Sequence, residues 1–365
     1  MSMKILDRYI IRNFLGTFVF ATVFLLSISV VIDLSQRLHR LEAHQGSVKN
    51  ALIHYYPLWA LWLGNTFMPI GVFISNIFFT SRLTNNTEIV AISSSGVSLH
   101  RLVRPYLISA LIIAMISFML NHYFLPITNR SKNEFLYRYL LSVSSKVKYE
   151  ENKKVSAQIT DNEYIFIDSF SRKDHTGSGF IYQKFKGQEL MHIITAANIH
   201  WDRNKRNYIL YDYRERYVEG DHEVLSNGIE LRKKFIVKPE ELLPEEYVAE
   251  TMNTFQLKKF IEKEKMKGTH NINLYSNEYY QRTSLPFSTF ILTFLAFSLS
   301  SQKRRGGIGM NLALGITLAF FYIFFMELSK NFSTKGYIVS FWAVWLPNIV
   351  FGLVSICFYW RRTQQ

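Results

Sequence analysis

Six long apolar runs without a charged residue constrain this chain more than any other feature. They contain no Asp, Glu, Lys or Arg, and Phe, Leu, Ile and Val dominate each of them. Each is between 19 and 25 residues long, and they cover residues 14–32, 57–81, 105–127, 283–302, 306–326 and 336–360. A helix of about 18 or more such residues can cross the ~30 Å hydrocarbon core of a bilayer. The sequence therefore predicts six transmembrane helices and excludes soluble, disordered and collagen-like chains.

The segment between the third and fourth runs, residues 128–282, has a different composition. It holds 26 Lys+Arg and 23 Asp+Glu, and aromatic and β-branched residues gather in six short stretches. These predicted strands are 155–159, 163–170, 179–185, 189–199, 207–217 and 231–237, with turn-like sequences at 171–178, 201–206 and 220–228. Strands without intervening helices predict a sandwich or jellyroll-like domain. Amphipathic helical connectors are predicted on either side, at 129–148 and 254–267, the second with Thr254 as N-cap and Gly268 after its end.

The predicted fold is thus a polytopic α-helical membrane protein with six transmembrane helices, three before and three after an inserted β-domain. The domains are 1–127, 128–282 and 283–365. Eleven basic residues flank one set of helix ends: Lys4, Arg8, Arg12, Arg82, Arg101, Arg104, Lys303, Arg304, Arg305, Arg361 and Arg362. Only five flank the other: Arg37, Arg40, Lys49, Lys330 and Lys335. The positive-inside rule places both termini in the cytoplasm and the β-domain on the far side.

Charge and motif content exclude several other classes of function. The net charge of +14 lies mostly in the membrane part, which argues against a nucleic-acid partner. The chain has no P-loop, no H-E-x-x-H, no C-x-x-C and no G-x-S-x-G, so we expect no catalytic residue, metal or cofactor. His122 is the only histidine in a predicted span, and we interpret it as a hydrogen-bonded interfacial residue rather than a zinc or proton-relay site. The single cysteine, Cys357, cannot form an intrachain disulfide.

A short helix is predicted in the loop between the second and third runs, near residues 85–96. Asn86 or Thr87 can cap it, and Glu88 lies in its first turn, where the helix dipole favours an acid. Its apolar side chains are Ile89, Val90 and Ile92. No Lys or Arg lies between Arg82 and Arg101, whereas a helix on anionic lipid would carry basic residues. The pattern therefore favours a protein partner with a complementary groove.

At these residues the sequence resembles a known family. Segment 82–96 is similar to the coupling segment of the LptF/LptG (YjgP/YjgQ) permeases of lipopolysaccharide export. Further segments resemble family motifs in the same order: 4–10 at the opening, 279–286 at the start of the fourth span, 304–306 with 314–316 between the fourth and fifth, and 345–348 in the sixth. The similarity covers nearly the whole chain. The opening and the compact length favour LptG over LptF.

The resemblance implies one half of an ABC exporter in the Gram-negative inner membrane, with a periplasmic β-jellyroll domain. Such a permease pairs with its sister subunit, binds a dimer of the LptB ATPase, and passes lipopolysaccharide to LptC and an LptA-like periplasmic bridge. It is not an enzyme, and ATP is used by the partner. The residues implied in ATPase coupling are Arg82, Glu88, Ile89 and Ile92. Alternatives are the LptF-type sister subunit or a non-transporting envelope scaffold.

The resemblance also places a lateral gate for the lipid between the first and fifth spans. Arg37 and Arg40 follow the first span, and Lys330 follows the fifth, so these cations could meet the lipid phosphates. Each could equally be an interfacial anchor. Asp33 and Arg37 are four residues apart and could pair on one helix face. Glu327 requires a partner near the membrane, which could be Lys330 at i+3 or a cation across the gate.

Overall fold

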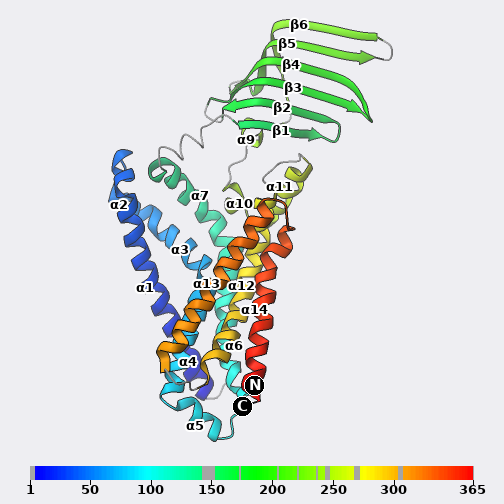
Figure 1. Cartoon of the computed structure of the whole chain (residues 1–365). Helices are drawn as coiled ribbons and strands as arrows, with labels where there is room; N and C mark the ends of the chain where they lie inside the picture. Colours follow the sequence, from blue (N-terminus) through cyan, green and yellow to red (C-terminus); the bar gives the residue numbers. More distant parts are fainter. Residues whose placement is uncertain are drawn as a thin grey trace. The chain divides into compact units, whose positions relative to one another are not determined.

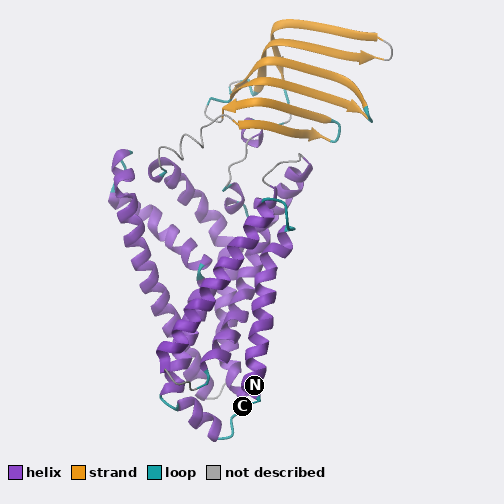
Figure 2. Ribbon diagram, viewed as in Figure 1, coloured by secondary structure: helices purple, strands orange, loops and turns teal. Residues whose placement is uncertain are grey.

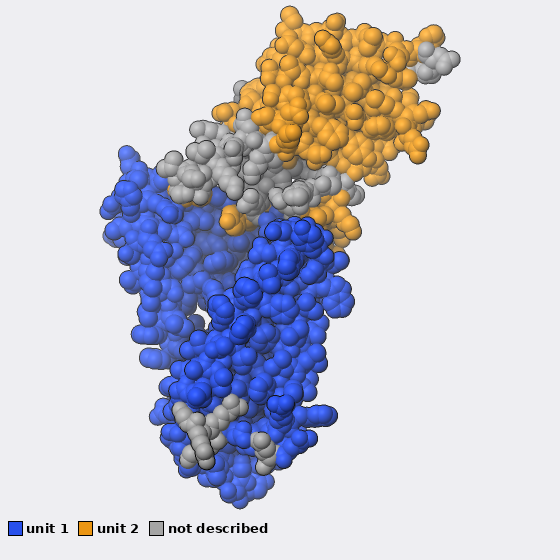
Figure 3. All heavy atoms as spheres, viewed as in Figure 1, with its two compact units in different colours: residues 1–140, 249–255, 273–365 blue, residues 141–248, 256–272 orange. Residues whose placement is uncertain are grey.

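The computed structural model describes residues 5–141, 153–171, 174–203, 205–219, 222–235, 237–242, 247–266, 272–302 and 307–364. Two compact units make up the chain (Figure 3). The helical unit comprises Met1–Leu140, Ala249–Phe255 and Asn273–Gln365, and the sheet unit comprises Leu141–Val248 and Gln256–Ile272. All six predicted spans belong to the first unit and the predicted strands to the second.

Among the described residues, the helical unit contains five candidate spans that are continuous helices and one that is a pair of helices joined at a bend (Figures 1 and 2). The continuous spans are α1 (Ile5–Ala43), Leu99–Leu140, α12 (Ile272–Ser300), α13 (Gly307–Thr334) and α14 (Ser340–Thr363). Within Leu99–Leu140, α6 (Leu99–Met119) and α7 (Leu125–Phe135) alternate with two π-helical turns, Leu120–Phe124 and Leu136–Leu140. The predicted connector 129–148 is thus helical as far as Leu140, and its last residues lie outside the described ranges. With the bent span counted once, the six predicted spans are confirmed.

The second predicted span is bent by 66° rather than straight. Its first part runs from Val48 to Thr66 and includes α2 (Val48–Asn50), a π-helical turn (Ala51–Tyr55) and α3 (Tyr56–Thr66), and its second part is α4 (Met68–Asn85). The break falls at Phe67, and Pro69 lies in the first turn of α4. Proline has no N–H to donate to the carbonyl of Asn65, so one continuous helix cannot pass this point undisturbed.

The sheet unit holds one antiparallel sheet in which each strand pairs with the next along the chain (Figure 1). Its strands are β1 (Lys153–Thr160), β2 (Glu163–Ser171), β3 (Thr176–Lys186), β4 (Glu189–Asp202), β5 (Asn207–Glu219) and β6 (His222–Lys233). This confirms a β-domain between helices, consistent with a jellyroll-like fold. Buried residues of the strands form its core, and Phe235, after β6, packs its ring near those of Phe180, Tyr182 and Tyr208.

Two strands extend into sequences that were predicted to be turns. β6 covers most of 220–228 and ends before 237, and β3 begins inside 171–178. The glycines that suggested turns lie in strands because a neighbouring side chain occupies the space of a Cβ. At Gly228 a Cβ would lie 2.8 Å from the ring of Tyr213, and at Gly177 it would lie 2.9 Å from Ile167. Glycine in a strand therefore marks a close approach here rather than a turn.

Three short elements follow the sheet in sequence: α9 (Pro239–Leu242), α10 (Val248–Thr251) and α11 (Thr254–Met266). Helix α11 confirms the second predicted connector, while Gly268 lies outside the described residues. Residues Ala249–Phe255 belong to the helical unit. The chain therefore contributes a short non-membrane segment to the helical unit, and this segment becomes important in the site described below.

Candidate functional site

The two described ends of the chain lie at the same end of the helical unit, together with helix α5 (Glu88–Ser94) (Figure 1). We call this the terminal end, and the opposite end, where α1 stops at Ala43, the far end. Helix α5 confirms the short helix predicted near 85–96. Its cap differs from the prediction: Thr87 has a left-handed backbone (φ 62°) and its side chain does not cap the helix. Its hydroxyl instead donates to the carbonyl of Asn86 (2.6 Å).

Glu88 is half-buried and has a partner in a distant part of the sequence. The hydroxyl of Tyr9, on α1, donates to Glu88 Oε2 at 3.0 Å. The amide of Asn86 reaches Glu88 Oε1 at only 3.5 Å, and Arg82 is exposed. The carboxylate therefore lies at the surface with one oxygen oriented by α1, which leaves it open to a cationic partner.

The apolar side of α5 faces its own chain more than the sequence indicated. Ile89 is only 2% exposed and belongs to one apolar cluster with Ile10 of α1, and Ile92 packs against the same cluster. Val90 is half exposed and is the outward apolar residue of the predicted set. Of the residues implied in ATPase coupling, the structure thus places Glu88 and Arg82 at the surface and Ile89 in the interior.

A second contact at the terminal end was missed by the sequence reasoning. Arg101, in the first turn of α6, donates from both terminal nitrogens to Asp7 of α1, at 2.7 Å and 2.6 Å. Asp7 is buried and Arg101 is about one-quarter exposed. Such a bidentate guanidinium–carboxylate pair is among the stronger charged contacts. Asp7 is the only acid among residues 4–12, which also contain Lys4, Arg8 and Arg12. This isolated acid is the sequence signal that could have suggested the ion pair.

At the far end, the charged residues proposed to meet the substrate are paired locally. Arg37 and Asp33 form an ion pair at 2.9 Å on one face of α1, and Tyr56 donates to Asp33 at 3.2 Å. Lys330 and Glu327 form an ion pair at 2.6 Å on α13. Arg40 is exposed and has no ion pair within the described residues. The structure therefore brings together each local pair, and none of the contacts seen in the described ranges joins the α1 pair to the α13 pair.

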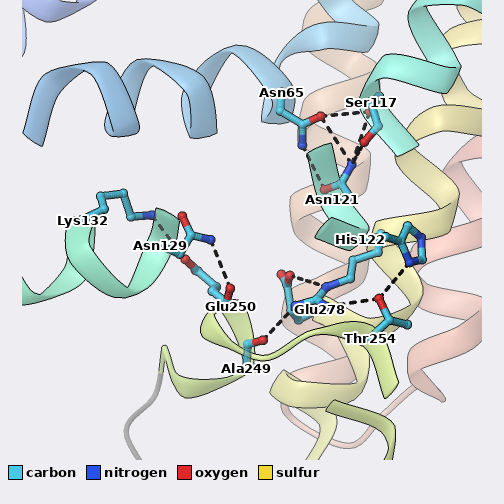
Figure 4. Close-up of polar contacts among 11 residues, drawn as sticks. Asn65, Ser117, Asn121, His122, Asn129, Lys132, Ala249, Glu250, Thr254 and Glu278 are labelled. Atoms are coloured by element: carbon cyan, nitrogen blue, oxygen red, sulfur yellow. Dashed lines mark hydrogen bonds and ion pairs between the residues drawn. The ribbon is translucent and has the colours of Figure 1, made fainter. Parts of the chain in front are cut away.

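A buried polar cluster of the helical unit centres on Arg282 of α12, which is 2% exposed, and Figure 4 labels its partners Glu278, Thr254 and Ala249. Its guanidinium donates to Glu278 (3.2 Å), to the hydroxyl of Thr254 (3.3 Å) and to the carbonyl of Ala249 (2.9 Å). Thr254 also forms a hydrogen bond of 2.8 Å with Nδ1 of His122. This contact fits the expectation of a hydrogen-bonded His122, and among the described residues no group of three metal-binding side chains occurs.

A neighbouring ion pair holds the same segment from the other side. Lys132 of α7 donates to Glu250 Oε2 at 3.4 Å, and the amide of Asn129 donates to the carbonyl of Glu250 at 3.3 Å (Figure 4). The ammonium also lies 4.3 Å from the centre of the Trp62 ring. Burial raises the pKa of Glu250, and the charge of Lys132 opposes that shift. Arg282, through hydrogen bonds, and Lys132, through an ion pair, both contact residues 249–254, so they fix this segment against the spans.

Buried amides lie beside the bend of the second span. Asn65, in the last turn of α3, donates to Asn121 (2.9 Å) and accepts from Ser117 (3.0 Å), as Figure 4 shows. Asn121 in turn donates to the carbonyl of Ser117 at 2.8 Å. Amide pairs of this kind are costly to leave unpaired in a membrane. They therefore fix the broken helix against the third span.

A cavity with a volume of about 570 Å³ lies on the sheet. Cross-strand neighbours Ser169, Ser178, Asn198 and Tyr211 line it, together with His200. Hydroxyl, amide and imidazole groups can form hydrogen bonds with a polar ligand. No contact in the described structure joins them into a nucleophile–base pair.

Comparison with known families decides what kind of protein carries these features. The family model of the lipopolysaccharide export system permease LptF/LptG matches residues 8–361, nearly the whole chain. The chain belongs to the LptF/LptG family. A search of curated proteins gives no match. The family match confirms the resemblance found in the sequence, and it treats LptF and LptG together.

Membership makes this LptF/LptG protein a subunit of a transporter rather than a catalytic enzyme. Its family-like motifs carry polar contacts between helices. The opening segment contains Asp7, which is buried, and Tyr9, which is exposed, and segment 279–286 contains the buried Arg282. In segment 345–348, Asn348 accepts from the hydroxyl of Tyr322 (2.9 Å) and donates to the carbonyl of Ser284 (3.3 Å). In this LptF/LptG chain, the motifs therefore join helices that are distant in the sequence.

Proposed function

We propose that this chain is the LptG-type permease of a lipopolysaccharide exporter, and that helix α5 couples it to a separate ATPase. The protein would extract lipopolysaccharide from the inner membrane together with its sister permease. An LptB dimer would dock at the terminal end on the cytoplasmic side, and LptC with an LptA-like bridge would receive the lipid in the periplasm. The β-domain would lie on the periplasmic side.

The observation that carries this proposal is Glu88. It is the first residue of a short helix between two spans, it is half-buried, and one of its oxygens is oriented by Tyr9. An acid that meets a basic groove fixes the register of a contact more strictly than an apolar residue does. The helix carries no basic residue that would favour contact with anionic lipid. A cationic protein groove therefore fits this surface best.

Substitution of Glu88 tests the proposal. Glu88→Lys should abolish lipopolysaccharide export and release the ATPase subunit, because two positive surfaces would then meet. Glu88→Gln should retain part of both activities. Ser94→Lys, an exposed position on the same helix, serves as the control for added charge. Export and ATPase association are measured on the same purified complex. Normal export by the Lys variant would contradict the coupling role.

On the substrate side, we infer that the far-end cations exchange their local partners for lipid phosphates. Arg40 is available directly, while Arg37 and Lys330 must leave Asp33 and Glu327. Loss of one cation should weaken export modestly, and loss of all three severely, with thermal stability measured alongside. Photo-crosslinkers at Ile32 and Glu327 should capture lipopolysaccharide, whereas one at Trp360 should not. Equal capture at the three positions, or full export by a stable triple variant, would leave these cations as interfacial anchors.

The assignment to LptG has its own test. The chain purified gently in detergent should bring down one ATPase and a second six-span permease of the sister type. A second copy of the same chain in that position would contradict the heterodimer. Recovery of neither protein would favour the scaffold alternative.

A further inference from the structure

The chain from the start of α5 to the first turn of α6, residues 88–101, is called the α5 segment here. Both of its ends contact the beginning of α1. Glu88, the first residue of α5, accepts a hydrogen bond from Tyr9, and Arg101, in the first turn of α6, forms the bidentate pair with Asp7. Ile89 lies in the apolar cluster of Ile10 between these two contacts. The loop that leads from the second span to the third is thus connected at its start and at its end to the first turns of α1.

Helix α1 is buried only near its two ends. Asp7, Ile10, Phe14 and Phe18 are buried at the terminal end, and Leu41 is buried at the far end. Between Phe18 and Leu41 no residue of α1 is buried in the helical unit. The middle of α1 is held by partly exposed contacts, such as those of Val30 and Leu34 with the cluster of Tyr55 and Tyr56, and by the hydrogen bond of Asp33 with Tyr56. The contacts of its first turns are therefore the buried ones through which movement at the terminal end can enter α1.

From this arrangement we propose that Asp7 and Tyr9 are positioning residues that transmit movement of α5 to α1. The inference rests on the proposed coupling role of α5 and deepens it. A partner that pulls or turns α5 moves Glu88 and, through the hydroxyl of Tyr9, the first turns of α1. The Asp7–Arg101 pair keeps the start of α6 moving with them. Helix α5 thus acts on α1 through the Tyr9–Glu88 hydrogen bond and the apolar cluster of Ile10 and Ile89, and the start of α6 acts on it through the Asp7–Arg101 pair.

The two contacts differ in strength, which sets the expected effects. The Tyr9–Glu88 hydrogen bond is single and exposed, so its loss should reduce the amount of lipid released per ATP by about threefold. The Asp7–Arg101 pair is bidentate and half-buried, so its loss should reduce coupling by about tenfold. Neither residue would contact the lipid or the nucleotide. The affected quantity is the amount of lipid released per ATP hydrolysed.

The test measures lipid release and ATP hydrolysis together on the complete complex in proteoliposomes that contain lipopolysaccharide. Tyr9→Phe and Asp7→Asn should keep the ATPase subunit bound and hydrolysis near the normal rate, while the lipid released per ATP falls. Asp7→Arg should lower it further, and Asp7→Arg combined with Arg101→Asp should restore it to within about twofold, because the pair is rebuilt in reverse. Tyr123→Phe is the matched control, since Tyr123 is exposed and its hydroxyl has no partner among the described residues.

A distance measurement separates transmission from simple stabilisation. Spin labels at Ile5 of α1 and Val90 of α5, both exposed, should keep one distance through the ATP cycle in the native complex. In Tyr9→Phe and Asp7→Asn the distance distribution should broaden on ATP binding, with thermal stability unchanged.

Specific results would overturn the inference. Native lipid release per ATP in both single variants, or failure of the charge reversal to restore that ratio in a stable complex, would remove Asp7 and Tyr9 from the coupling path. If Glu88→Lys still abolished export in that case, the proposed function would stand without them. Full export by Glu88→Lys would instead contradict the proposed function itself.

Discussion

Helices α1 and α12 are both long enough to span a membrane, yet they have opposite environments. The most apolar part of α1 has a mean hydropathy of 2.4, and 6% of it is buried in the chain. The corresponding part of α12 has a mean hydropathy of 1.4, and 72% of it is buried. The more apolar helix is therefore the more exposed one, which is the reverse of what holds in a soluble protein.

The composition of α12 explains the difference. Its buried face contains many small hydroxyl side chains: Ser284, Ser288, Thr289, Thr293, Ser298 and Ser300. Small residues let helices approach closely. The hydroxyls of Ser288, Thr289, Ser298 and Ser300 donate to carbonyls of the same helix, as Ser298 does to that of Phe294 (2.8 Å). Lipid tails are as apolar as leucine, so burial of leucine against another helix gains little from the hydrophobic effect. The following predictions compare variants on α12 or its neighbours with variants on α1.

The largest effect is expected at Arg282. Arg282→Leu removes a buried guanidinium that donates to the half-buried Glu278, to Thr254 and to the carbonyl of Ala249, and should lower the free energy of unfolding by roughly 3 kcal/mol. Arg12→Leu, at an exposed position of α1, is the control. Arg282→Lys should lie between the two, because it keeps the charge and loses the branched geometry. Thermal unfolding in detergent measures all three, and equal stability of the two Leu variants would contradict the buried network.

Removal of leucine packing should come next. Leu295→Ala on α12, where the side chain is fully buried, should cost about 2–3 kcal/mol of unfolding free energy because a cavity remains. Leu25→Ala on α1, which is about half exposed, should cost less than about 0.5 kcal/mol in the isolated chain. If Leu25→Ala reduces stability only when the sister permease is present, this face of α1 contacts that subunit.

A methyl group added at a glycine sharpens the comparison. A Cβ at Gly315 of α13 would collide with Cδ1 of Ile77 on α4, whereas nothing lies within 4 Å of a Cβ at Gly16 of α1. Gly315→Ala should therefore destabilise by about 1–2 kcal/mol, since the side chain of Ile77 must move. Gly16→Ala should be neutral or stabilising by up to about 1 kcal/mol. The same detergent unfolding assay applies, and a gain at both positions would contradict the close packing of α4 and α13.

The smallest effect is expected at the far end of α1. Tyr56→Phe removes the hydrogen bond to Asp33 and should cost about 0.5–1.5 kcal/mol of unfolding free energy. Tyr337→Phe, at an exposed hydroxyl, should cost nothing measurable. The Asp33–Arg37 ion pair keeps the carboxylate partnered in the variant, which limits the loss. A cost at Tyr56 as large as that at Leu295 would show that α1 is held much more firmly than its exposure indicates.

Much of the architecture could be predicted from local sequence patterns. The six uncharged runs were recognised as spans and the six β-rich stretches as strands. This was possible because hydropathy and the alternation of side chains are properties of neighbouring residues in the sequence. Glu88 was recognisable for the same reason, as a lone acid at the start of a short helix. Local pairing also accounted for Asp33 with Arg37 and Glu327 with Lys330, since three- and four-residue spacings fix neighbours on a helix.

Contacts between distant residues could not be predicted in this way. Lys132, Thr254 and Arg282 are spread over 150 residues, and their network exists only because segment 249–255 returns between the spans. The bend at Phe67 followed from the position of Pro69 within an apolar run that looked continuous. Gly177 and Gly228 suggested turns because their cross-strand neighbours were unknown.

The sequence by itself determined that this chain spans a membrane six times, carries a β-domain in the middle and has one acidic helix between its second and third spans. These properties depend on the composition of short stretches, because the hydropathy of each stretch decides whether it is stable in lipid or in water. Only the tertiary structure decided which spans are buried, that Arg282 and Lys132 hold a returning segment, and that Asp7 and Tyr9 connect α1 to the α5 segment. Such contacts depend on the geometry between distant residues, because the packing of the neighbouring helices decides whether a charged side chain is buried or exposed.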